Sequence, residues 1–566
     1  MNRRFVLLLA LFTISFAPLP EPPVKGLVTD QAMVVSAHPL ASQVGVEIMK
    51  KGGNAVDAVV AVQLALTVVF PAAGNIGGGG FMVLRQADGS IDALDYREKA
   101  PALAKTNMYL DKQGNVVPGL SSFGHLASGV PGSVDGMVEA HKKYGKLTWK
   151  EVVQPAIELA LKGFTLTDRE AKNLNDIQGA LIRYNSVPPA FLIRKWKSGD
   201  SIHWTDLGHT LERIRDKGRE GFYSGKTADD IVAEMKRGKG LISLEDLKNY
   251  KSVWRKPIVA NYKSFKIITM PPPSSGGICL AQLLKSVEPY PISKWGHNSA
   301  ETIHLMTEAE RWVYADRSKY LGDPDFFKVP VTQLLDSNYI KKRMTSYKKD
   351  VATSSKEVNP GAIQGYESVE TTHISIIDPA GNAVSTTTTL NEWFGSRVIV
   401  AGSGFFLNDE MDDFSSKPGS PNMYGLLGGE SNKIEPAKRM LSAMTPTIVE
   451  KDNKLFMVLG SPGGARIITA VFQVFLNVTE HHMGMQEAVN ARRVHSQWYP
   501  DAVFPEKGAL KSADSTSLAT MGHSIQSLRV LGTNGIGRVD AILVTKDGKL
   551  EGGADYSRGD NAARGF

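Results

Sequence analysis

Hydrophobic positions along the chain recur with two spacings, one near three to four residues that is typical of helices and one of two residues that is typical of strands. The helical spacing predicts helices over residues 41–51, 54–69, 134–144, 149–162, 207–217, 227–236, 243–248, 300–320, 337–347 and 467–477. The strand spacing predicts strands over residues 81–85, 91–97, 265–270, 371–377, 383–391, 454–460 and 541–545. Helices and strands alternate along the chain, which indicates a mixed α and β protein.

The clearest strand pattern covers residues 371–391. Runs rich in Thr, Ile and Val flank residues 378–382, Asp-Pro-Ala-Gly-Asn, a composition typical of a hairpin turn. Threonine favours strands because it is β-branched, so an ordinary half-buried hairpin accounts for the many hydroxyl groups. The alternative interpretation is that one of these threonines is a nucleophile.

The two ends of the chain differ in character. Asn2-Arg3-Arg4 precedes an apolar stretch over residues 5–16, which is typical of a secretory signal and short for a membrane span. We therefore expect residues 1–24 to form a signal peptide and spacer, and the protein to be exported to the periplasm or secreted. An uncleaved N-terminal anchor is the alternative. Residues 552–566 are predicted to form a polar tail.

Length and charge restrict the broad class of protein. The 566 residues exceed one small core and suggest either two to four domains or one large layered domain. The net charge of +7 includes no long Lys/Arg run, so nothing indicates nucleic-acid binding. The single cysteine excludes an internal disulfide framework.

Several short motifs have both a structural and a chemical interpretation. The glycine-rich residues 74–80 lack the Lys-Ser/Thr of a phosphate-binding loop, so we expect close backbone approach there. The acidic residues 408–414 lack the pattern of a calcium loop and are predicted to form a solvated turn. His481-His482 has no further ligand nearby in sequence, so no metal site is expected.

Arginine, glycine and loop residues supply further candidates. Arg97 could form a surface ion pair with Asp95 or Glu98, or present its guanidinium to a substrate carboxylate. Gly463-Gly464 could form a tight turn or an oxyanion hole. Residues 354–370 are predicted to be a polar linker, and residues 417–430 a mobile lid.

Motifs spread over almost the whole chain resemble one family. They are Gly77 to Phe81, Asp95 to Glu98, His125 to Gly132, Met270 to Gly277, Tyr314 to Arg317, Leu321 to Pro324, Thr371 to His373, Thr389 to Asn391, Met411 to Phe414 and Ser461 to Gly464. In this respect the sequence is similar to the γ-glutamyltranspeptidases, or glutathione hydrolases, of the N-terminal-nucleophile hydrolase superfamily.

The resemblance implies an α+β fold, a four-layer αββα sandwich. It also implies an inactive precursor that cuts itself between Glu370 and Thr371, leaving a large subunit (residues 25–370) and a small subunit (residues 371–566) in one intertwined unit. Thr371 would then carry both a nucleophilic hydroxyl and a free α-amino group, whose reference pKa of about 7.7–8.0 suits a general base. No cofactor and no metal are expected.

The resemblance also assigns roles by matching position. The residues expected to act in catalysis or donor binding are Thr371 (nucleophile), Thr389 (hydrogen bond to it), Gly463 and Gly464 (oxyanion hole), Arg97 and Ser442 (donor α-carboxylate), Asn391, Glu410 and Asp413 (donor α-ammonium) and Tyr424 (lid). Ala443 departs from the pattern, because the family has a second serine there. Glu392-Trp393 is bulkier than expected of bacterial relatives.

The implied activity is transfer of the γ-glutamyl group of glutathione and related compounds to water, an amino acid or a short peptide. Ala443 keeps open a glutaryl or cephalosporin acylase on the same scaffold, although Asp413 has no use in a site for a donor without an ammonium group. A non-catalytic binding protein of the cell envelope is the third hypothesis.

Overall fold

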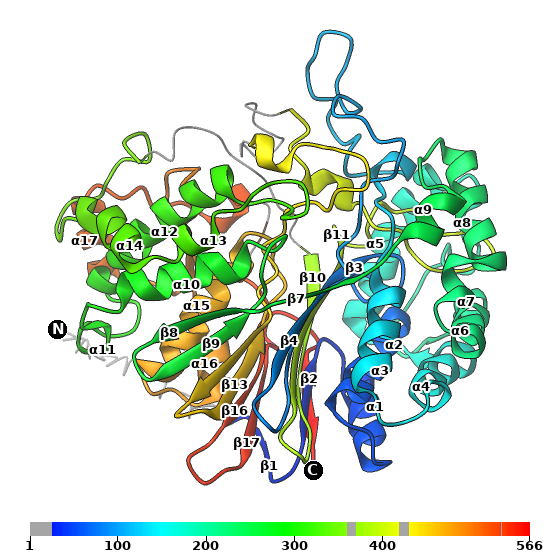
Figure 1. Cartoon of the computed structure of the whole chain (residues 1–566), viewed down its shortest axis with the longest axis horizontal. Coiled ribbons are helices and arrows are strands. Elements are labelled where there is room, and N and C mark those ends of the chain that lie inside the picture. The colour runs from blue at the N-terminus through cyan, green and yellow to red at the C-terminus, as the bar shows by residue number, and fades with distance from the viewer. Residues whose placement is uncertain (1–24, 359–369, 418–428, 532, 534) are drawn as a thin grey trace, which may run out of the picture.

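Two seven-stranded sheets lie face to face, and helices cover the outer face of each (Figure 1). The computed structural model describes residues 25–358, 370–417, 429–531, 533 and 535–566. Helix, sheet, sheet and helix follow one another across the molecule, which confirms the predicted α+β sandwich.

The first sheet contains the predicted threonine-rich hairpin at its centre. All its neighbouring strands are antiparallel. Its strands, in spatial order, are β18 (Ala562–Gly565), β2 (Met33–Ser36), β10 (Glu370–Ile377), β11 (Ala383–Asn391), β3 (Gly79–Arg85), β4 (Ile91–Asp95) and β7 (Val253–Arg255).

The second sheet is also antiparallel and packs on the hairpin through β13 and β16. Its strands, in spatial order, are β1 (Leu27–Thr29), β17 (Leu550–Ala554), β16 (Asp540–Val544), β13 (Lys454–Gly460), β12 (Thr447–Lys451), β9 (Phe265–Thr269) and β8 (Ile258–Tyr262). Two short pairs lie outside the main sheets, β5 (Phe164–Thr165) with β6 (Ser201–Ile202) and β14 (Val494–His495) with β15 (Phe504–Pro505).

Helices form the two outer layers (Figure 1). On the side of the hairpin sheet lie α1 (Pro39–Lys50), α2 (Ala55–Val69), α3 (Ser133–Tyr144), α4 (Trp149–Lys162), α5 (Asp168–Tyr184), α6 (Thr205–Lys217), α7 (Glu220–Tyr223), α8 (Gly225–Gly238) and α9 (Leu244–Asn249). On the side of the second sheet lie α10 (Gly276–Val287), α11 (Ile292–Trp295), α12 (Ala300–Tyr320), α13 (Val331–Leu334), α14 (Ser337–Arg343), α15 (Arg466–Thr479), α16 (Met485–Asn490) and α17 (Ser512–Thr520).

The hairpin sheet is buried on both faces because its strands alternate between two cores. One core lies against the helices of that side, and it receives Val34, Met82, Leu84, Ile374 and Ile376. The other lies between the sheets, and it receives Met33, Val35, Phe81 and Val83. Successive side chains of a strand point to opposite faces of the sheet. Apolar residues occupy both sets of positions here, so both faces of the sheet are buried.

Helix α2 explains the apolar run in the first part of the chain. Every residue of α2 is buried, and the helix packs against α1, α4 and the β10–β11 hairpin. Asn54 and Asp57 form a reciprocal capping box at its start, which satisfies backbone N–H groups inside the protein. The apolar run therefore forms a buried core helix.

Hydroxyl groups of the hairpin connect the two sheets. Ser385 Oγ donates to the Leu459 carbonyl oxygen (3.0 Å) and accepts from the Thr447 N–H (2.9 Å). Ser375 Oγ donates to the Asp540 carbonyl oxygen (3.0 Å). Buried hydroxyls are stable only when hydrogen-bonded, so these bonds allow polar residues in the central layer.

The C-terminal segment is not the predicted polar tail. Its residues form β17 and β18, and β18 pairs with β2 in the hairpin sheet. The Phe566 carbonyl oxygen also accepts hydrogen bonds from the N–H groups of Gln31 (2.9 Å) and Ala32 (3.1 Å). The small residues of β18 show little hydrophobic pattern. This edge strand is held by backbone pairing with β2 instead.

Both sheets contain strands from before and after residue 370. Strands β1, β2, β3, β4, β7, β8 and β9 precede it in sequence, and β10, β11, β12, β13, β16, β17 and β18 begin at or follow it. The hairpin itself lies between β2 and β3. Glu370 and Thr371 both belong to β10.

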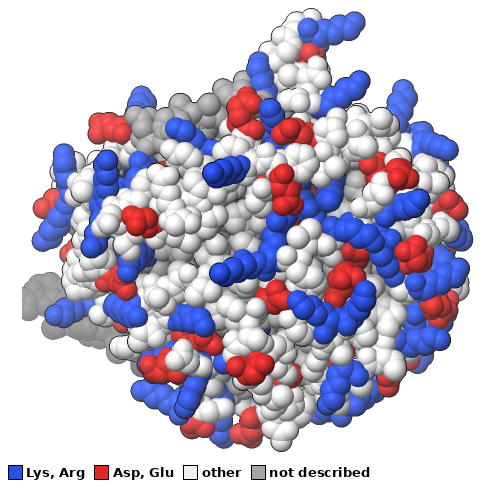
Figure 2. All heavy atoms as spheres, viewed as in Figure 1, with Lys and Arg blue, Asp and Glu red and all other residues white. Residues whose placement is uncertain are grey.

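On the face shown in Figure 2, basic and acidic side chains are interspersed rather than gathered into one large patch of a single sign. Among the helices of the described residues, none has the length and apolar character needed to cross a bilayer.

Candidate functional site

Thr371 lies at the irregular start of the hairpin. The register of β10 on β11 shifts between Glu370 and Thr372, and Glu370 pairs with Asn391 at the far end of β11. Such a bulge re-aims the side chains around it. Thr371 is 5% exposed, and the hairpin brings it to the same end as Thr389 and Asn391, as predicted from the sequence.

A small cavity brings most of the predicted site residues together. It is lined by Arg97, Thr371, Thr389, Asn391, Glu410, Asp413, Ser442, Ala443, Met444, Gly464 and Ile467. These come from the segment after β4, the hairpin, the 3₁₀ turn Glu410–Asp413, the segment before β12 and the start of α15. Gly463 is adjacent in sequence and lines a neighbouring cavity. Tyr424 lies outside the described residues.

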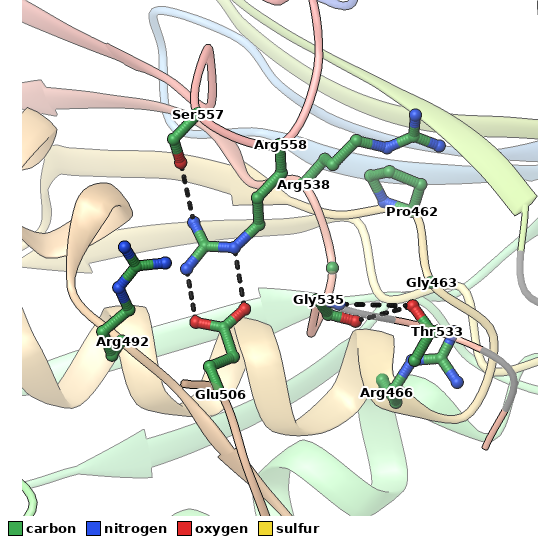
Figure 3. A pocket seen from close by; sticks show the side chains of 11 residues that line it. Pro462, Gly463, Arg466, Arg492, Glu506, Thr533, Gly535, Arg538, Ser557 and Arg558 are labelled. Atoms are coloured by element: carbon green, nitrogen blue, oxygen red, sulfur yellow. Dashed lines mark hydrogen bonds and ion pairs between the residues drawn. The ribbon is translucent and has the colours of Figure 1, made fainter. Parts of the chain in front are cut away.

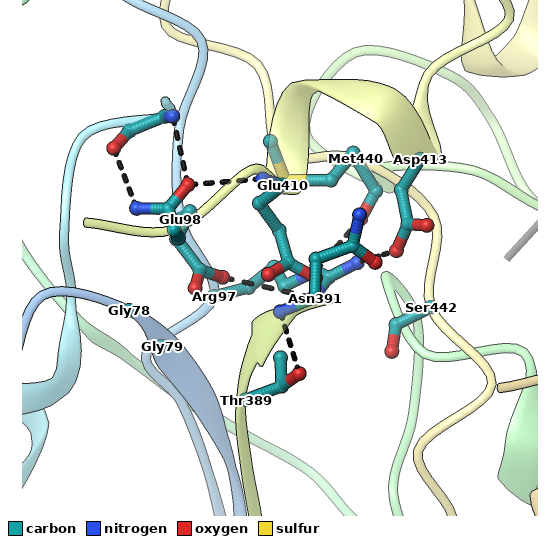
Figure 4. Close-up of polar contacts among 12 residues, drawn as sticks. Gly78, Gly79, Arg97, Glu98, Thr389, Asn391, Glu410, Asp413, Met440 and Ser442 are labelled. Carbon is teal, nitrogen blue, oxygen red and sulfur yellow. Dashed lines mark hydrogen bonds and ion pairs between the residues drawn. The ribbon is translucent and has the colours of Figure 1, made fainter. Parts of the chain in front are cut away.

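Arg97 is buried and ion-paired, so a surface role is excluded. Its guanidinium donates to the carboxylates of both Glu410 and Asp413 (Figure 4). It also donates to the carbonyl oxygens of Met440 (3.3 Å) and Leu441 (3.1 Å). The planar fork of arginine suits this arrangement, because it presents several donors in fixed directions.

Carboxylates outnumber cations around Arg97. Glu98 lies 3.6 Å from the Arg97 guanidinium, and its carboxyl oxygens make no hydrogen bond to another described residue. Burial raises the pKa of Glu98 to about 7. Burial also raises the pKa of Glu410 and of Asp413 well above the usual range. The predicted solvated turn at residues 408–414 is therefore wrong, because its carboxylates are buried against Arg97.

The glycine-rich loop passes close to the site, as expected from its composition. A Cβ atom on Gly78 would lie 2.0 Å from the Thr389 carbonyl oxygen, and one on Gly79 would lie 2.6 Å from a Glu98 carboxyl oxygen. The Asn75 side-chain amide donates to that same Thr389 carbonyl (2.9 Å). Only glycine allows the loop to approach the end of β11 and Glu98 so closely.

Asn391 has a backbone conformation that orients the end of β11. Its φ of 82° lies in the left-handed region, which asparagine tolerates better than most residues. Its N–H donates to Thr389 Oγ1 (2.8 Å), and its side-chain amide donates to the Asp409 carbonyl (3.0 Å). These bonds connect the hairpin to the acidic turn that carries Glu410.

Hydrogen bonds to its backbone fix the position of Ser442. Its carbonyl oxygen accepts from both the N–H and the Oγ of Ser275 (2.6 Å each), and Arg317 Nε donates to that same Ser275 Oγ (2.8 Å). Ser442 Oγ accepts from the Met444 N–H (3.2 Å), which leaves the Ser442 hydroxyl hydrogen for a ligand. Ala443 lines the cavity next to it and offers no hydroxyl.

Gly463 and Gly464 form the turn between β13 and α15. Their φ values are 135° and 58°, both unfavourable for other residues. Neither N–H donates to an acceptor among the described residues, whereas their carbonyl oxygens accept from the Arg466 and Ile467 N–H groups (3.2 and 2.9 Å). Backbone N–H groups at the start of a helix are suited to binding a developing anion.

One group of buried side chains among the described residues has the types and spacing of metal ligands. His304, Glu308 and His523 lie together on α12 and a later loop, away from the residues that line the Thr371 cavity. His304 Nδ1 and His523 Nε2 are hydrogen-bonded at 2.7 Å, and His304 Nε2 bonds to the Lys348 carbonyl (2.8 Å). This network gives both ring nitrogens of His304 and one of His523 a partner within the protein.

Comparison with known proteins identifies the family. The γ-glutamyltranspeptidase family profile matches residues 41–565. The chain belongs to the γ-glutamyltranspeptidase family. It is 46% identical to the glutathione hydrolase proenzyme of Pseudomonas sp. (strain A14), over 91% of this chain and 89% of that protein. It is 44% identical to the glutathione hydrolase proenzyme of Escherichia coli (strain K12), over 98% and 97% of the two chains.

The fold of the γ-glutamyltranspeptidase family extends to acylases. The crystal structure of a cephalosporin acylase from Bacillus halodurans aligns with a TM-score of 0.83 and 26% identity, covering 98% of this chain and 99% of that one. The chain is therefore an enzyme of the γ-glutamyltranspeptidase family on an N-terminal-nucleophile hydrolase scaffold, and the resemblance stated from sequence motifs is confirmed.

Two residues around this candidate site were not assigned from the sequence. Glu98 was considered only as a surface partner of Arg97, and Asn408 only as part of a solvated turn. Asn408 instead accepts from the N–H groups of Gly129 (2.8 Å) and Glu410 (3.0 Å) and donates to the Gly77 carbonyl (2.8 Å). Glu98 belongs to the charged motif around Arg97, and Asn408 belongs to the acidic motif of residues 408–414. Segments distant in sequence bury both residues, and a local sequence pattern does not reveal such burial.

Proposed function

We propose that Thr371 is the nucleophile both for cleavage of the precursor and for γ-glutamyl transfer. The observation that carries this proposal is the cavity that Thr371 shares with Arg97, Glu410, Asp413 and Ser442. A cation, carboxylates and hydroxyls at one small site suit a zwitterionic amino-acid group. The substrate would be glutathione or a related γ-glutamyl compound.

In the first step Thr371 Oγ1 attacks the carbonyl carbon of Glu370. The peptide C–N bond breaks, an ester links Glu370 to Thr371 Oγ1, and the Thr371 nitrogen becomes a free α-amino group. Water then hydrolyses the ester, releasing the Glu370 carboxylate and restoring the hydroxyl. The register shift of β10 at this point interrupts the regular ladder next to the peptide bond that would be cut.

In the second step the free α-amino group takes the proton of Oγ1 as the oxygen attacks the γ-carbonyl carbon of the donor. The N–H groups of Gly463 and Gly464 stabilise the oxyanion of the tetrahedral intermediate. The donor amine leaves with a proton, and a γ-glutamyl ester remains on Thr371. Water or an acceptor amine attacks that ester and regenerates the enzyme.

Charge balance favours a γ-glutamyl donor. In the structure the Arg97 guanidinium is paired with Glu410 and Asp413, so an arriving carboxylate must compete with them. When the donor's α-carboxylate binds the guanidinium, Glu410 and Asp413 lose the cation that paired with them. The α-ammonium group of the same donor then takes the place of that cation. A donor without the ammonium group leaves buried carboxylates unpaired, which is costly.

The proposal is tested by comparing the wild type with Thr371→Ala. The wild type should split on a denaturing gel, the small fragment should begin Thr-Thr-His-Ile, and γ-glutamyl-p-nitroanilide should be hydrolysed. Thr371→Ala should remain a single band and be inactive. Thr372→Val is the matched control, because the Thr372 hydroxyl has no hydrogen-bond partner within the described parts of the chain. Equal bands for wild type and Thr371→Ala would refute the proposal.

A glutaryl or cephalosporin acylase is the second candidate, favoured by Ala443 and by the similarity in fold to the Bacillus halodurans acylase. Fewer hydroxyls around the carboxylate site would relax selection of the acyl group. Parallel assays with γ-glutamyl-p-nitroanilide and a glutaryl anilide distinguish the two candidates. A higher kcat/KM for the glutaryl compound would favour the acylase.

Export through the N-terminal signal is also part of the proposal. The basic residues 2–4 and the apolar residues 5–16 support it. Cell fractionation should place activity outside the cytoplasm, and the mature large subunit should begin after the apolar stretch. A large subunit that keeps Met1 would indicate an anchored protein instead.

A further inference from the structure

A second cavity lies beside the Thr371 cavity and is rich in arginine. Its volume is about 350 Å³, and it is lined by Pro462, Gly463, Arg466, Arg492, Glu506, Thr533, Gly535, Gly537, Arg538, Ser557 and Arg558. Glu506 is the only acidic residue among those lining residues. A cavity with this balance attracts anions and disfavours cations.

The arginines of the cavity differ in how they are engaged (Figure 3). Arg558 donates to both carboxylate oxygens of Glu506, with 2.8 Å between Nε and Oε1. The Arg538 guanidinium lies over the Trp393 ring, 5.0 Å from its centroid. Arg492 is exposed, and no hydrogen bond or ion pair joins its guanidinium to another described residue. Arg492 is therefore available to a ligand.

The position of the cavity defines which part of a substrate could reach it. Gly463 lines this cavity and the next residue, Gly464, lines the cavity that holds Thr371. The γ-glutamyl group of the proposed donor would occupy the Thr371 cavity, and the peptide on the amine side of its amide bond would extend out of that cavity. The peptide beyond the amide nitrogen spans about 7 Å if it has two extended residues, and the two cavities are lined by consecutive residues whose Cα atoms are about 3.8 Å apart.

We propose that the arginine-lined cavity binds the C-terminal carboxylate of the peptide on the amine side of the scissile bond, with Arg492 as the principal ligand. This inference rests on the proposed γ-glutamyl transfer. The same chemistry recognises two sources of carboxylate, the peptide that leaves the donor and the peptide that arrives as acceptor. Arginine suits this role because its fork binds a carboxylate through two hydrogen bonds.

The test compares substrates that differ only at this carboxylate, using the processed wild-type enzyme. One arm measures hydrolysis of glutathione and of its glycine C-terminal amide. The other measures transfer from γ-glutamyl-p-nitroanilide to glycylglycine and to glycylglycine amide, at matched concentrations of unprotonated amine. In whichever arm the carboxylate binds in the cavity, kcat/KM should be about tenfold higher for the acid than for the corresponding amide.

Variants of Arg492 assign the preference to the cavity. In Arg492→Gln the ratio of kcat/KM for the acid to kcat/KM for the amide should fall toward one. Arg492→Lys should retain part of the preference for the acid, through charge alone. Arg529→Gln, which removes an exposed arginine not lining the cavity, should keep the wild-type ratio.

Equal rates for acid and amide in both arms, or a full preference in Arg492→Gln, would overturn the inference. If γ-glutamyl-p-nitroanilide is still turned over in that case, the proposed function stands and only the carboxylate site fails. Absence of turnover with every γ-glutamyl donor would contradict the proposed function itself, and this inference with it.

Discussion

Arg97 shows how a single side chain can be placed by several distant segments. It follows β4, yet its fork is fixed by Glu410 and Asp413 from the acidic turn and by two carbonyl groups near Ser442. A buried ion pair contributes little to stability compared with an apolar replacement of the same shape. Under the proposed function its use is in recognition, since the pocket already contains both charges that a zwitterion must meet.

Glu98 predicts a pH dependence of stability. Its pKa is about 7 in the folded protein against 4.5 for the ordinary group, so between these values the folded state binds more protons than the unfolded state. The free energy of unfolding should therefore fall as pH rises through this window, by at most about 1.4 kcal/mol per pH unit from this group.

This prediction is measured by urea unfolding at pH 5 and pH 7 in the uncut Thr371→Ala background. Glu98→Gln should lose less stability between the two pH values than its parent does. Glu487→Gln, at an exposed position in α16, should behave like the parent. An identical pH response in Glu98→Gln and its parent would contradict the assignment.

Ala443 predicts a gain of donor affinity on restoring a hydroxyl. Ala443→Ser should lower the KM for γ-glutamyl-p-nitroanilide by about ten- to a hundredfold with a smaller change in kcat, because a hydrogen bond to a charged group contributes about 1.5–3 kcal/mol. Ser442→Ala should raise KM by a similar factor. Steady-state kinetics on both variants check this, and an unchanged KM in Ala443→Ser would show that its hydroxyl does not reach the carboxylate.

At the scale of elements, the glycine-rich loop and the hairpin depend on each other. The loop approaches the end of β11 so closely that even one methyl group has no room at Gly78. Because Thr389 and Asn391 lie at that end of β11, a shift there would move the groups around Thr371. Packing of the loop therefore controls chemistry that the loop does not perform.

Gly78→Ala should slow precursor cleavage strongly and lower stability by about 1–3 kcal/mol through overpacking. A time course on a denaturing gel and a thermal unfolding curve measure the two effects. Gly179→Ala in α5 is the matched control, because its added methyl group would meet nothing within 4 Å. That control should cleave normally and gain about 0.8–1 kcal/mol in helix propensity. Normal cleavage in Gly78→Ala would refute the coupling.

The elements differ in how far the sequence could predict them. Helix α4 has the predicted bounds, because its apolar stripe and its ends are both marked in the sequence. Helix α5 was missed although Thr167 and Glu170 form a capping box and Leu174, Ile177 and Leu181 face the core at helical spacing. Its high charge obscured that stripe. Strand β18 could not be predicted, since pairing with β2 holds it rather than a pattern of its own.

Site residues were found by motif resemblance rather than by physical pattern. The many threonines of β11 predict only a strand, and nothing in their spacing separates Thr389 from its neighbours. The structure brings Arg97, Thr371, Ser442 and Gly464 to one cavity from parts of the chain far apart in sequence. Such convergence depends on the tertiary fold, which local hydrophobic periodicity does not specify.

At the scale of the whole molecule, the proposed cut at Glu370–Thr371 would leave two chains that share both sheets. The fragments should stay together after processing, because each would expose the edges of strands now paired with the other. Size-exclusion chromatography in high salt should give one peak containing both bands on a denaturing gel. Separate elution of the two fragments would show that the strand pairing does not hold them.

Interleaving of the strands also has a kinetic consequence. Before the cut, the two halves of the sandwich are held at a high effective concentration by their own peptide link. After it, recovery from unfolding becomes a second-order encounter of two chains whose yield falls on dilution, and neither chain contains a complete sheet to serve as a template. The mature enzyme would then stay folded because it unfolds slowly, and not because it refolds readily after unfolding.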